Sequence, residues 1–379
     1  MRNFFLFLAA AFLLTSCGDN TVEFTGTVLG SNTGKVLISN SANEIVYQTD
    51  ITNGKFYIAK QALPAAGFYQ LVCSSRIVAA IKNEIYLEPG VYYTIDMDAR
   101  LVKEYPKITS KSKNQTDLSA YHELLKAAKE STRDKVMSLD SQMHKLDDQV
   151  LTFEERSSRM QKLRNEQLDA NVVDMVAVFN AFLKQHPDSE ILPHLMLNTE
   201  YQLNPVGYNE VFKKLSDAAK NTSEGKQLEE KLNQLTRLAA GSDAPELEGT
   251  TPDGKTVDLK ALNKKVIIVD FWRALNSQSL RDHEEMATKL LPKYKGKGLD
   301  VVSVSFDDNK PKWERYITKS NMTWTQLCDL KGNESPNAEK WAITKIPTYY
   351  LLDGKGHIIK RCLDYYELEV AVNDYMAKH

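Results

Sequence analysis

The polar run Asn276-Ser-Gln-Ser279, followed four residues later by His283, carries side chains that could do chemistry. Residues four apart lie on one face of a helix, so Ser279 and His283 can meet there. A serine hydroxyl becomes a nucleophile only beside a general base, and His283 is the one nearby candidate. The sequence indicates neither an orienting acid nor oxyanion donors, so a hydrolytic pair is a minor alternative. The favoured interpretation of His283 is a solvated helix residue.

The chain has four cysteines, Cys17, Cys73, Cys328 and Cys362. Cys328 and Cys362 lie in strand-like runs rather than at a helix N-terminus, where thiolates are stabilised. We therefore expect each to be a buried or half-buried hydrophobe. Their spacing leaves a Cys328–Cys362 disulfide open. The seven histidines lack ligand spacing, so we predict neither a metal nor another cofactor.

The elements around the polar run must position it. Val266-Ile-Ile-Val-Asp-Phe-Trp272 is a β-branched apolar run typical of a buried central strand. After the polar run, Leu280, Met286, Leu290 and Leu291 form an amphipathic pattern that predicts a helix. The polar run therefore joins a buried strand to a helix N-terminus.

Together, Val266–Trp272 and Arg273–Ser279 resemble the active-site approach of thioredoxins and, more closely, of the thioredoxin-like thiol-disulfide oxidoreductases of bacterial envelopes, the redoxin group. The resemblance covers roughly residues 241–379 and implies a thioredoxin-like α/β fold. It continues in the lead-in segments, the second central strand and the Ile-Pro-Thr strand, represented by Gly241–Gly249, Asp253–Leu259, Lys295–Ser305 and Lys345–Asp353.

In the redoxin group, the positions of Asn276, Ser277, Gln278 and Ser279 form a Cys-x-x-Cys motif. That motif works because a helix N-terminus lowers the first thiol's pKa, so that a thiolate attacks a disulfide and a second thiol resolves it. Neither Asn276 nor Ser279 can take these roles. We therefore predict degenerate active-site positions and no catalytic residue, and lean towards a protein that is not an enzyme.

The resemblance also suggests a binding groove. Asp270 matches a buried acid beneath the cysteine pair, and we expect it to be a satisfied strand-end carboxylate. Pro347 matches the family's cis-proline, so the Ile346–Pro347 bond is expected to be cis. A groove bounded by Trp272, the Asn276–Ser279 loop and Ile346-Pro347 is expected to remain after the chemistry is lost.

The N-terminus specifies a compartment. One positive charge precedes an apolar stretch that is too short to span a membrane. The stretch ends in Leu14-Thr-Ser-Cys17, which resembles the lipobox of bacterial lipoproteins. This implies that residues 1–16 are a signal peptide and that Cys17 is acylated, giving a lipid anchor in the cell envelope. The outer membrane is favoured, facing the periplasm or the surface. A plain secretory peptide is the alternative.

Charge excludes one class of partner. Removing residues 1–16 takes away only Arg2, so 48 basic residues become 47 against 50 acidic residues, a net charge of −3. Without a long Lys/Arg run, this balance argues against nucleic acid as a partner. The membrane, through Cys17, and a polypeptide or envelope protein remain the predicted partners.

Residues 20–112 contain short strand-like runs separated by turn residues, which predicts a small β-sandwich. The segment resembles an N-terminal β-domain of unknown function found ahead of the thioredoxin-like domain in envelope lipoproteins. Phe56, Tyr57, Tyr92 and Tyr93 could line a binding surface. Alternation between core and surface is the favoured interpretation.

Residues 113–240 change to a helical pattern and are predicted to connect the two β-containing domains. An apolar stripe from Val136 to Phe153 recurs at intervals of three and four. It favours packing within the helical module over a coiled-coil partner. Ala239-Ala-Gly-Ser242 is the predicted boundary before the thioredoxin-like domain.

We expect a membrane-anchored lipoprotein without redox cysteines that binds a polypeptide or an envelope partner. One alternative is a thiol-disulfide or peroxide oxidoreductase that uses Cys328 or Cys362. The other is a structural thioredoxin-like domain, with the function residing in the β-domain.

Overall fold

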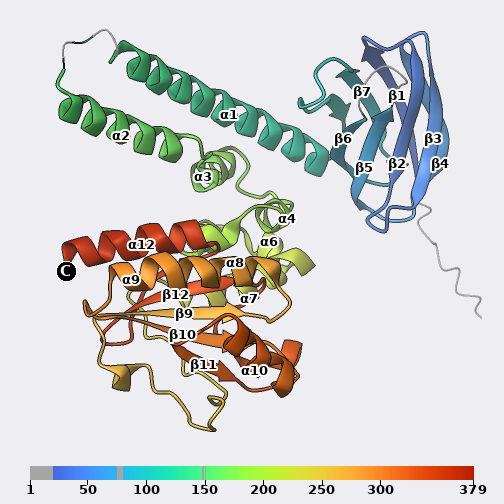
Figure 1. Ribbon diagram of the computed structural model, residues 1–379. Helices are drawn as coiled ribbons and strands as arrows, with labels where there is room; N and C mark the ends of the chain where they lie inside the picture. Colours follow the sequence, from blue (N-terminus) through green and yellow to red (C-terminus); the bar gives the residue numbers. More distant parts are fainter. Residues whose placement is uncertain (1–19, 75–79, 147–148, 150) are drawn as a thin grey trace, which may run out of the picture. The chain divides into compact units, whose positions relative to one another are not determined.

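A computed structural model describes residues 20–74, 80–146, 149 and 151–379 of the chain (Figure 1). The chain divides into two compact units, Met1–Leu195 with Leu215–Thr222 and Met196–Lys214 with Ser223–His379. The predicted signal peptide and Cys17 lie outside the described residues. Within the described ranges, no helix is both long and apolar enough to cross a membrane.

Eight strands of the first unit form one hydrogen-bonded sheet in the order β6-β5-β2-β3-β4-β1-β7-β8. The strands are β1 (Thr21–Leu29), β2 (Thr33–Ser39), β3 (Ile45–Thr52), β4 (Lys55–Ala62), β5 (Gly67–Ser74), β6 (Ile81–Leu87), β7 (Tyr92–Asp98) and β8 (Lys107–Ser110). β3 and β4 are linked by a single pair, Thr52 with Lys55. The sheet therefore has two halves of four strands each.

The two halves share one hydrophobic core. Phe24 of β1 contacts Tyr47 of β3, with ring centroids 5.6 Å apart, and stacks on Tyr93 of β7 at 5.5 Å. β1 alternates between half-buried and buried residues, as expected for a strand with one face in a core. The alternation predicted for the aromatics is confirmed, because Phe56 and Tyr93 are buried while Tyr57 and Tyr92 are exposed.

Helices follow the first sheet: α1 (Lys113–Lys145), α2 (Phe153–Ala170), α3 (Met175–Gln185), α4 (Leu192–Leu197) and α6 (Asp217–Asn221). Ser112 caps α1 by accepting a hydrogen bond from the Gln115 backbone N–H. The apolar stripe from Val136 to Phe153 does not lie on one helix, because α1 ends at Lys145 and α2 begins at Phe153.

The second sheet has the order β11-β10-β9-β12-β13. Its strands are β9 (Val266–Trp272), β10 (Leu299–Ser305), β11 (Thr325–Cys328), β12 (Thr348–Asp353) and β13 (Ile358–Cys362). β9 is central and buried along its whole length, paired parallel to β10 and antiparallel to β12. The described fold is thus mixed α/β with a β-rich N-terminal sheet, which confirms the predicted fold class.

The helical elements of the second unit are η1 (Tyr201–Leu203), α5 (Pro205–Lys213), α7 (Ser223–Thr236), η2 (Lys260–Leu262), α8 (Ser277–Glu285), the π-helical turn η3 (Met286–Leu290), α9 (Leu291–Lys293), α10 (Lys310–Lys319), η4 (Gly332–Glu334), α11 (Pro336–Lys340) and α12 (Tyr365–Lys378). Helices of the predicted 113–240 connector thus belong to both compact units. The predicted domain boundaries remain predictions.

One segment, residues 241–250, reaches both edges of the second sheet. At the β13 edge, the Gly241 N–H donates to the Ile358 carbonyl and the Ile358 N–H donates to the Ser242 carbonyl. At the β11 edge, Thr250 and Cys328 exchange backbone hydrogen bonds of 3.1 Å. The segment therefore pairs with part of each edge strand.

Candidate functional site

The candidate site lies where β9 ends and α8 begins. β9 delivers the chain to Trp272 at the end of the buried strand, and the next residues form a short loop. α8 begins at Ser277 with Asn276 as its N-cap in an extended conformation. The predicted strand, polar loop and helix therefore occur in that order.

Asn276 joins the helix to the loop that precedes β12. Its side-chain oxygen accepts a hydrogen bond from the Ser279 backbone N–H at 2.9 Å. Its side-chain nitrogen donates to the Ile346 carbonyl at 3.1 Å. The Ile346–Pro347 bond is cis, as predicted. We call this pair of hydrogen bonds the Asn276 clip.

The other loop residues divide between surface and interior. Ser277 and Gln278 are exposed, and Gln278 donates through Nε2 to Asp282 Oδ1 at 2.7 Å. Ser279 is fully buried, and its hydroxyl has no hydrogen-bond partner within the described structure. A substrate on the surface therefore has no direct access to this hydroxyl.

Asp270 and His283 form a buried pair beneath the loop. His283 Nε2 lies 2.7 Å from Asp270 Oδ2, and both side chains are at most 1% exposed. Ser303 Oγ donates to the same carboxylate oxygen at 2.6 Å, and Trp324 Nε1 donates to Ser303 Oγ at 2.8 Å. The expectation that His283 is a solvated helix residue is therefore wrong. The expected satisfied carboxylate is found only in part, because Asp270 Oδ1 has no hydrogen-bond partner within the described structure.

Asp270 supplies the acid that the Ser279/His283 pair lacks in the sequence. His283 Nδ1, the ring nitrogen that faces away from this carboxylate, has no partner within the described structure, and neither has Ser279 Oγ. A catalytic serine requires a hydrogen bond to its base and access to substrate. With neither present, the arrangement does not support hydrolysis.

Asp282, on α8, is the second buried carboxyl of the site. Tyr349 OH donates to its Oδ2 at 2.7 Å. Burial raises the pKa of Asp282 despite the hydrogen bonds from Tyr349 and Gln278, and burial also raises the pKa of Tyr349. Within the described residues, no group of three or more His, Cys, Asp or Glu side chains is arranged to hold a metal ion.

The predicted groove needs one correction. Trp272 is fully buried, so it packs in the core and offers no wall to a ligand, and Asp270 lies equally deep. The residues that reach the surface are Leu275, which is 64% exposed, with Ser277, Gln278 and the half-buried Ile346. Leu275 was missed in the sequence, although an apolar residue immediately before the polar run at a predicted helix N-terminus is a visible signal.

The cysteines of this domain lie on opposite sheet edges. Cys328 ends β11 and Cys362 ends β13, four strand spacings apart, or roughly 19 Å. A disulfide needs Cα atoms within about 7 Å, so the open option of a Cys328–Cys362 bridge is excluded, and both thiols are free. Burial raises the pKa of Cys328, and raises that of Cys362 to about 12. Both are therefore poor nucleophiles.

Comparison with known proteins agrees with this geometry. Residues 240–361 match the model of the AhpC/TSA family. The thiol-disulfide oxidoreductase ResA from a strain of Bacillus cereus is 23% identical over 127 residues, covering 34% of this chain and 71% of that protein.

Two solved structures are also similar in sequence to the C-terminal part of the chain. The thioredoxin domain of the thiol-disulfide oxidoreductase BVU-2223 from Bacteroides vulgatus is 28% identical, covering 37% of this chain and 99% of that one, with a TM-score of 0.34. A thiol-disulfide oxidoreductase from Bacteroides fragilis NCTC 9343 is 25% identical, covering 35% of this chain and 98% of that one, with a TM-score of 0.33.

Proposed function

We propose that the C-terminal domain, which is similar to the thioredoxin-like redoxins, has lost the redox reaction and binds a polypeptide at the Asn276 loop. The observation that carries the loss of the redox reaction is the Asn276 clip. An amide that caps α8 and holds the Ile346 carbonyl occupies the position where a reactive thiol is required. The side chain now stabilises the site instead of reacting there.

Neither of the two cysteines in the domain is placed to begin a thiol reaction. A redoxin reaction begins with a thiolate, and the two cysteines of the domain are buried with raised pKa values. Each would have to leave the core and ionise before meeting a disulfide or a peroxide. This argues against the oxidoreductase that would use Cys328 or Cys362.

The surface at the loop suits a polypeptide with an apolar residue flanked by acidic ones. Leu275 and Ile346, which flank the Asn276 clip, together supply apolar area, and apolar side chains that gather on a surface mark contact sites. Arg281 and Lys345 are exposed within a few residues of the loop and of Ile346. These two positive charges favour a partner of opposite charge.

A two-step assay tests the loss of chemistry. The natural chain is expected to leave insulin disulfides intact, whereas Asn276→Cys with Ser279→Cys gains measurable reductase activity, because α8 still begins at this loop. Asn276→Ala with Ser279→Ala is the matched control, since it removes the same side chains without adding thiols. Insulin reduction by the natural chain would overturn the proposal.

Binding is tested separately with a photo-crosslinking amino acid at Ser277. The expected result is one dominant crosslinked polypeptide that disappears when Leu275→Glu is added. Tyr366, which is 66% exposed on α12, provides a matched crosslinking site remote in sequence from the loop. Equal capture from both sites would contradict a specific surface.

We also propose that Cys17 carries a lipid that holds the chain on the cell envelope. The supporting observation is Leu14-Thr-Ser-Cys17 after a short apolar stretch. Cys17→Ser is expected to leave a protein that fractionates away from membranes and lacks incorporated fatty acid. Recovery of the natural chain as an unlipidated, freely soluble protein would overturn this proposal.

One observation favours a structural domain as the second candidate. Asn276 already takes up the Ile346 carbonyl, a backbone group that an incoming extended polypeptide would use beside a cis-proline. If the double-cysteine variant folds but keeps two free thiols under oxidising conditions, the loop backbone has diverged. The function would then be sought in the β-domain.

A further inference from the structure

One half of the N-terminal sheet carries a flat face of polar side chains. It consists of ten outward residues of β4, β1, β7 and β8, which we call the polar face: Lys55, Tyr57, Glu23, Thr25, Thr27, Tyr92, Thr94, Asp96, Lys107 and Thr109. Ala59, Leu29 and Asp98 are the next outward residues along β4, β1 and β7 and form its margin. The register places these residues side by side, since Thr25 pairs with both Tyr57 and Thr94, and Thr94 pairs with Thr109. From Glu23 to Thr27 the face extends roughly 13 Å along β1.

The two tyrosines of this face are held in place. Tyr57 OH donates to Glu23 Oε1 at 2.6 Å, and Tyr92 OH lies 2.6 Å from Thr25 Oγ1. Tyr57 from β4 and Tyr92 from β7 both reach side chains on β1, while 53% and 47% of their surfaces stay exposed. A fixed, exposed ring binds a ligand with little loss of side-chain entropy.

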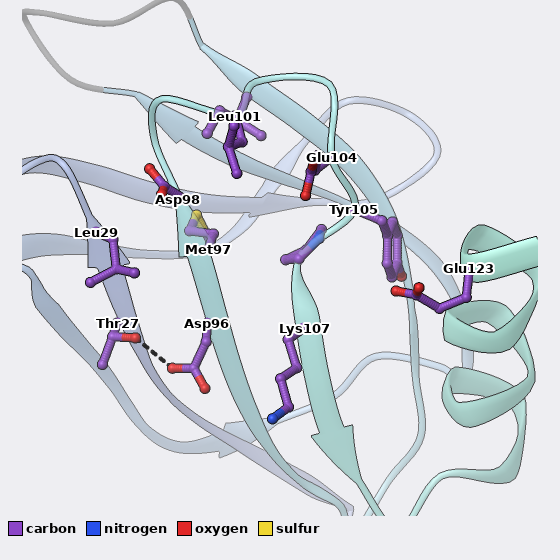
Figure 2. Close-up of a pocket in the computed structure, with 12 residues that line it drawn as sticks. Thr27, Leu29, Asp96, Met97, Asp98, Leu101, Glu104, Tyr105, Lys107 and Glu123 are labelled. Atoms are coloured by element: carbon purple, nitrogen blue, oxygen red, sulfur yellow. Dashed lines mark hydrogen bonds between the residues drawn. The ribbon is translucent and has the colours of Figure 1, made fainter. Parts of the chain in front are cut away.

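The polar face continues into a cavity of about 480 Å³. Thr27, Asp96 and Lys107 lie side by side across β1, β7 and β8. They belong to the polar face and also line the cavity (Figure 2). Thr27 Oγ1 donates to Asp96 Oδ1 at 2.6 Å. The opposite side includes Tyr105, whose hydroxyl donates to the Glu84 carbonyl at 2.9 Å and whose ring stacks on His122. A flat surface thus leads into a hollow lined by polar and apolar groups.

The composition of the polar face indicates the class of ligand. Its ten residues include no aliphatic side chain, and Ala59 and the exposed Leu29 lie at its margin, so its centre lacks the apolar area that a protein partner would bury. It has four threonine hydroxyls, and its two lysines balance one aspartate and one glutamate. The cavity adds Asp98, Glu104 and Glu123, of which Asp98 pairs with Arg100 and Glu104 with Lys126. A balanced charge favours a neutral ligand. Tyrosine faces attract C–H groups, and hydroxyls and carboxylates bind hydroxyl groups.

We propose that the polar face and its adjoining cavity bind a neutral oligosaccharide. The sugar rings stack on Tyr57 and Tyr92, and one end of the sugar chain enters the cavity past Thr27, Asp96 and Lys107. Such a site gives the β-domain a binding function that does not depend on the Asn276 loop.

Calorimetric titration of the full-length chain tests this proposal. The probes are neutral hexasaccharides of glucose, xylose, mannose and N-acetylglucosamine, with hexagalacturonate as the charged comparison. At least one neutral probe is expected to bind, and Tyr57→Ala with Tyr92→Ala is expected to weaken that binding about tenfold or more. Tyr366→Ala, which removes an equally exposed tyrosine from the other unit, is expected to leave it unchanged.

Two further variants separate the ring from its hydroxyl and the face from the cavity. Tyr92→Phe keeps the ring, so its effect is expected to be smaller than that of Tyr92→Ala. Asp96→Leu places an aliphatic group at the cavity entrance and is expected to weaken binding without unfolding the β-domain, as checked by circular dichroism. Three outcomes would each overturn the proposal: no binding by any neutral probe, equal binding by the folded double-alanine variant, or preference for hexagalacturonate.

Discussion

The two sheets of this chain place their polar side chains in opposite environments. In the C-terminal domain, Asp270, Ser279 and His283 are buried beneath the candidate site. In the N-terminal sheet, Tyr57 and Tyr92 are fixed by hydrogen bonds and remain about half exposed. The resemblance to known proteins is strongest in the C-terminal domain, where these polar groups are buried. The comparison teaches that the more accessible polar surface lies in the region with the weaker resemblance.

The largest expected effect tests whether the buried pair is structural. His283→Ala leaves the Asp270 carboxylate buried without its histidine partner, which is expected to lower the free energy of unfolding of this domain by about 3–5 kcal/mol. Ser279→Ala removes a buried hydroxyl that has no partner in the described structure, so it is expected to be neutral or slightly stabilising. All four tryptophans lie within residues 241–379, so tryptophan fluorescence in urea reports this domain. Equal effects of the two substitutions would contradict this assignment.

The next effect concerns acid stability of the N-terminal unit. Burial, with a smaller effect from nearby Lys129, lowers the pKa of His122 from 6.5 to about 4. The folded state therefore favours the neutral ring. The stability of the N-terminal unit is greatest above pH 6.5 and falls as the pH drops towards 4, because the unfolded chain takes up the proton first. The loss is on the order of 3 kcal/mol. His122→Phe retains a ring against Tyr105 and is expected to remove this dependence, as measured by tyrosine near-ultraviolet circular dichroism. An unchanged pH profile would contradict it.

A smaller effect tests the Asn276 clip. Asn276→Ala removes both hydrogen bonds and is expected to lower the free energy of unfolding by about 1–2 kcal/mol. Asn276→Asp keeps the acceptor for the Ser279 N–H but cannot donate to Ile346, so a smaller loss is expected. Urea unfolding followed by tryptophan fluorescence measures both. If the aspartate variant is as unstable as the alanine variant, the helix cap contributes little.

The smallest expected effect on stability concerns the two exposed tyrosines of the N-terminal sheet. Tyr57→Ala and Tyr92→Ala are each expected to change stability by less than about 0.5 kcal/mol, because both rings lie on the surface. Thermal unfolding of the N-terminal unit, followed by far-ultraviolet circular dichroism, measures this. A loss of several kcal/mol would show that the tyrosines are packing residues and that their arrangement reflects folding.

The sequence predicted the framework of the C-terminal domain because its signals are local. Val266–Trp272 is a continuous apolar run, and the structure has that run as the central strand β9. The motif around Ile346-Pro347 predicted the cis bond that the structure contains. Trp272 was misplaced because the sequence alone does not say which side of a strand end faces a groove.

The buried pair could not be predicted with the same certainty, because it joins residues 13 apart through tertiary packing. A signal was present, since His283 stands three residues before Met286 and seven before Leu290, both buried. This spacing places His283 on the inner face of the helix and its turn. The polar face was equally hidden, because the register of four strands determines which threonines and tyrosines become neighbours.

The segment at residues 241–250, which pairs with part of both edges of the C-terminal sheet, has a consequence for self-association. Exposed sheet edges are templates on which another chain can add a strand, and protein aggregation often begins there. Here the chain uses its own backbone at Gly241, Ser242 and Thr250 to occupy positions on both edges. These hydrogen bonds leave fewer free backbone groups on both edges for a second copy of the domain to pair with.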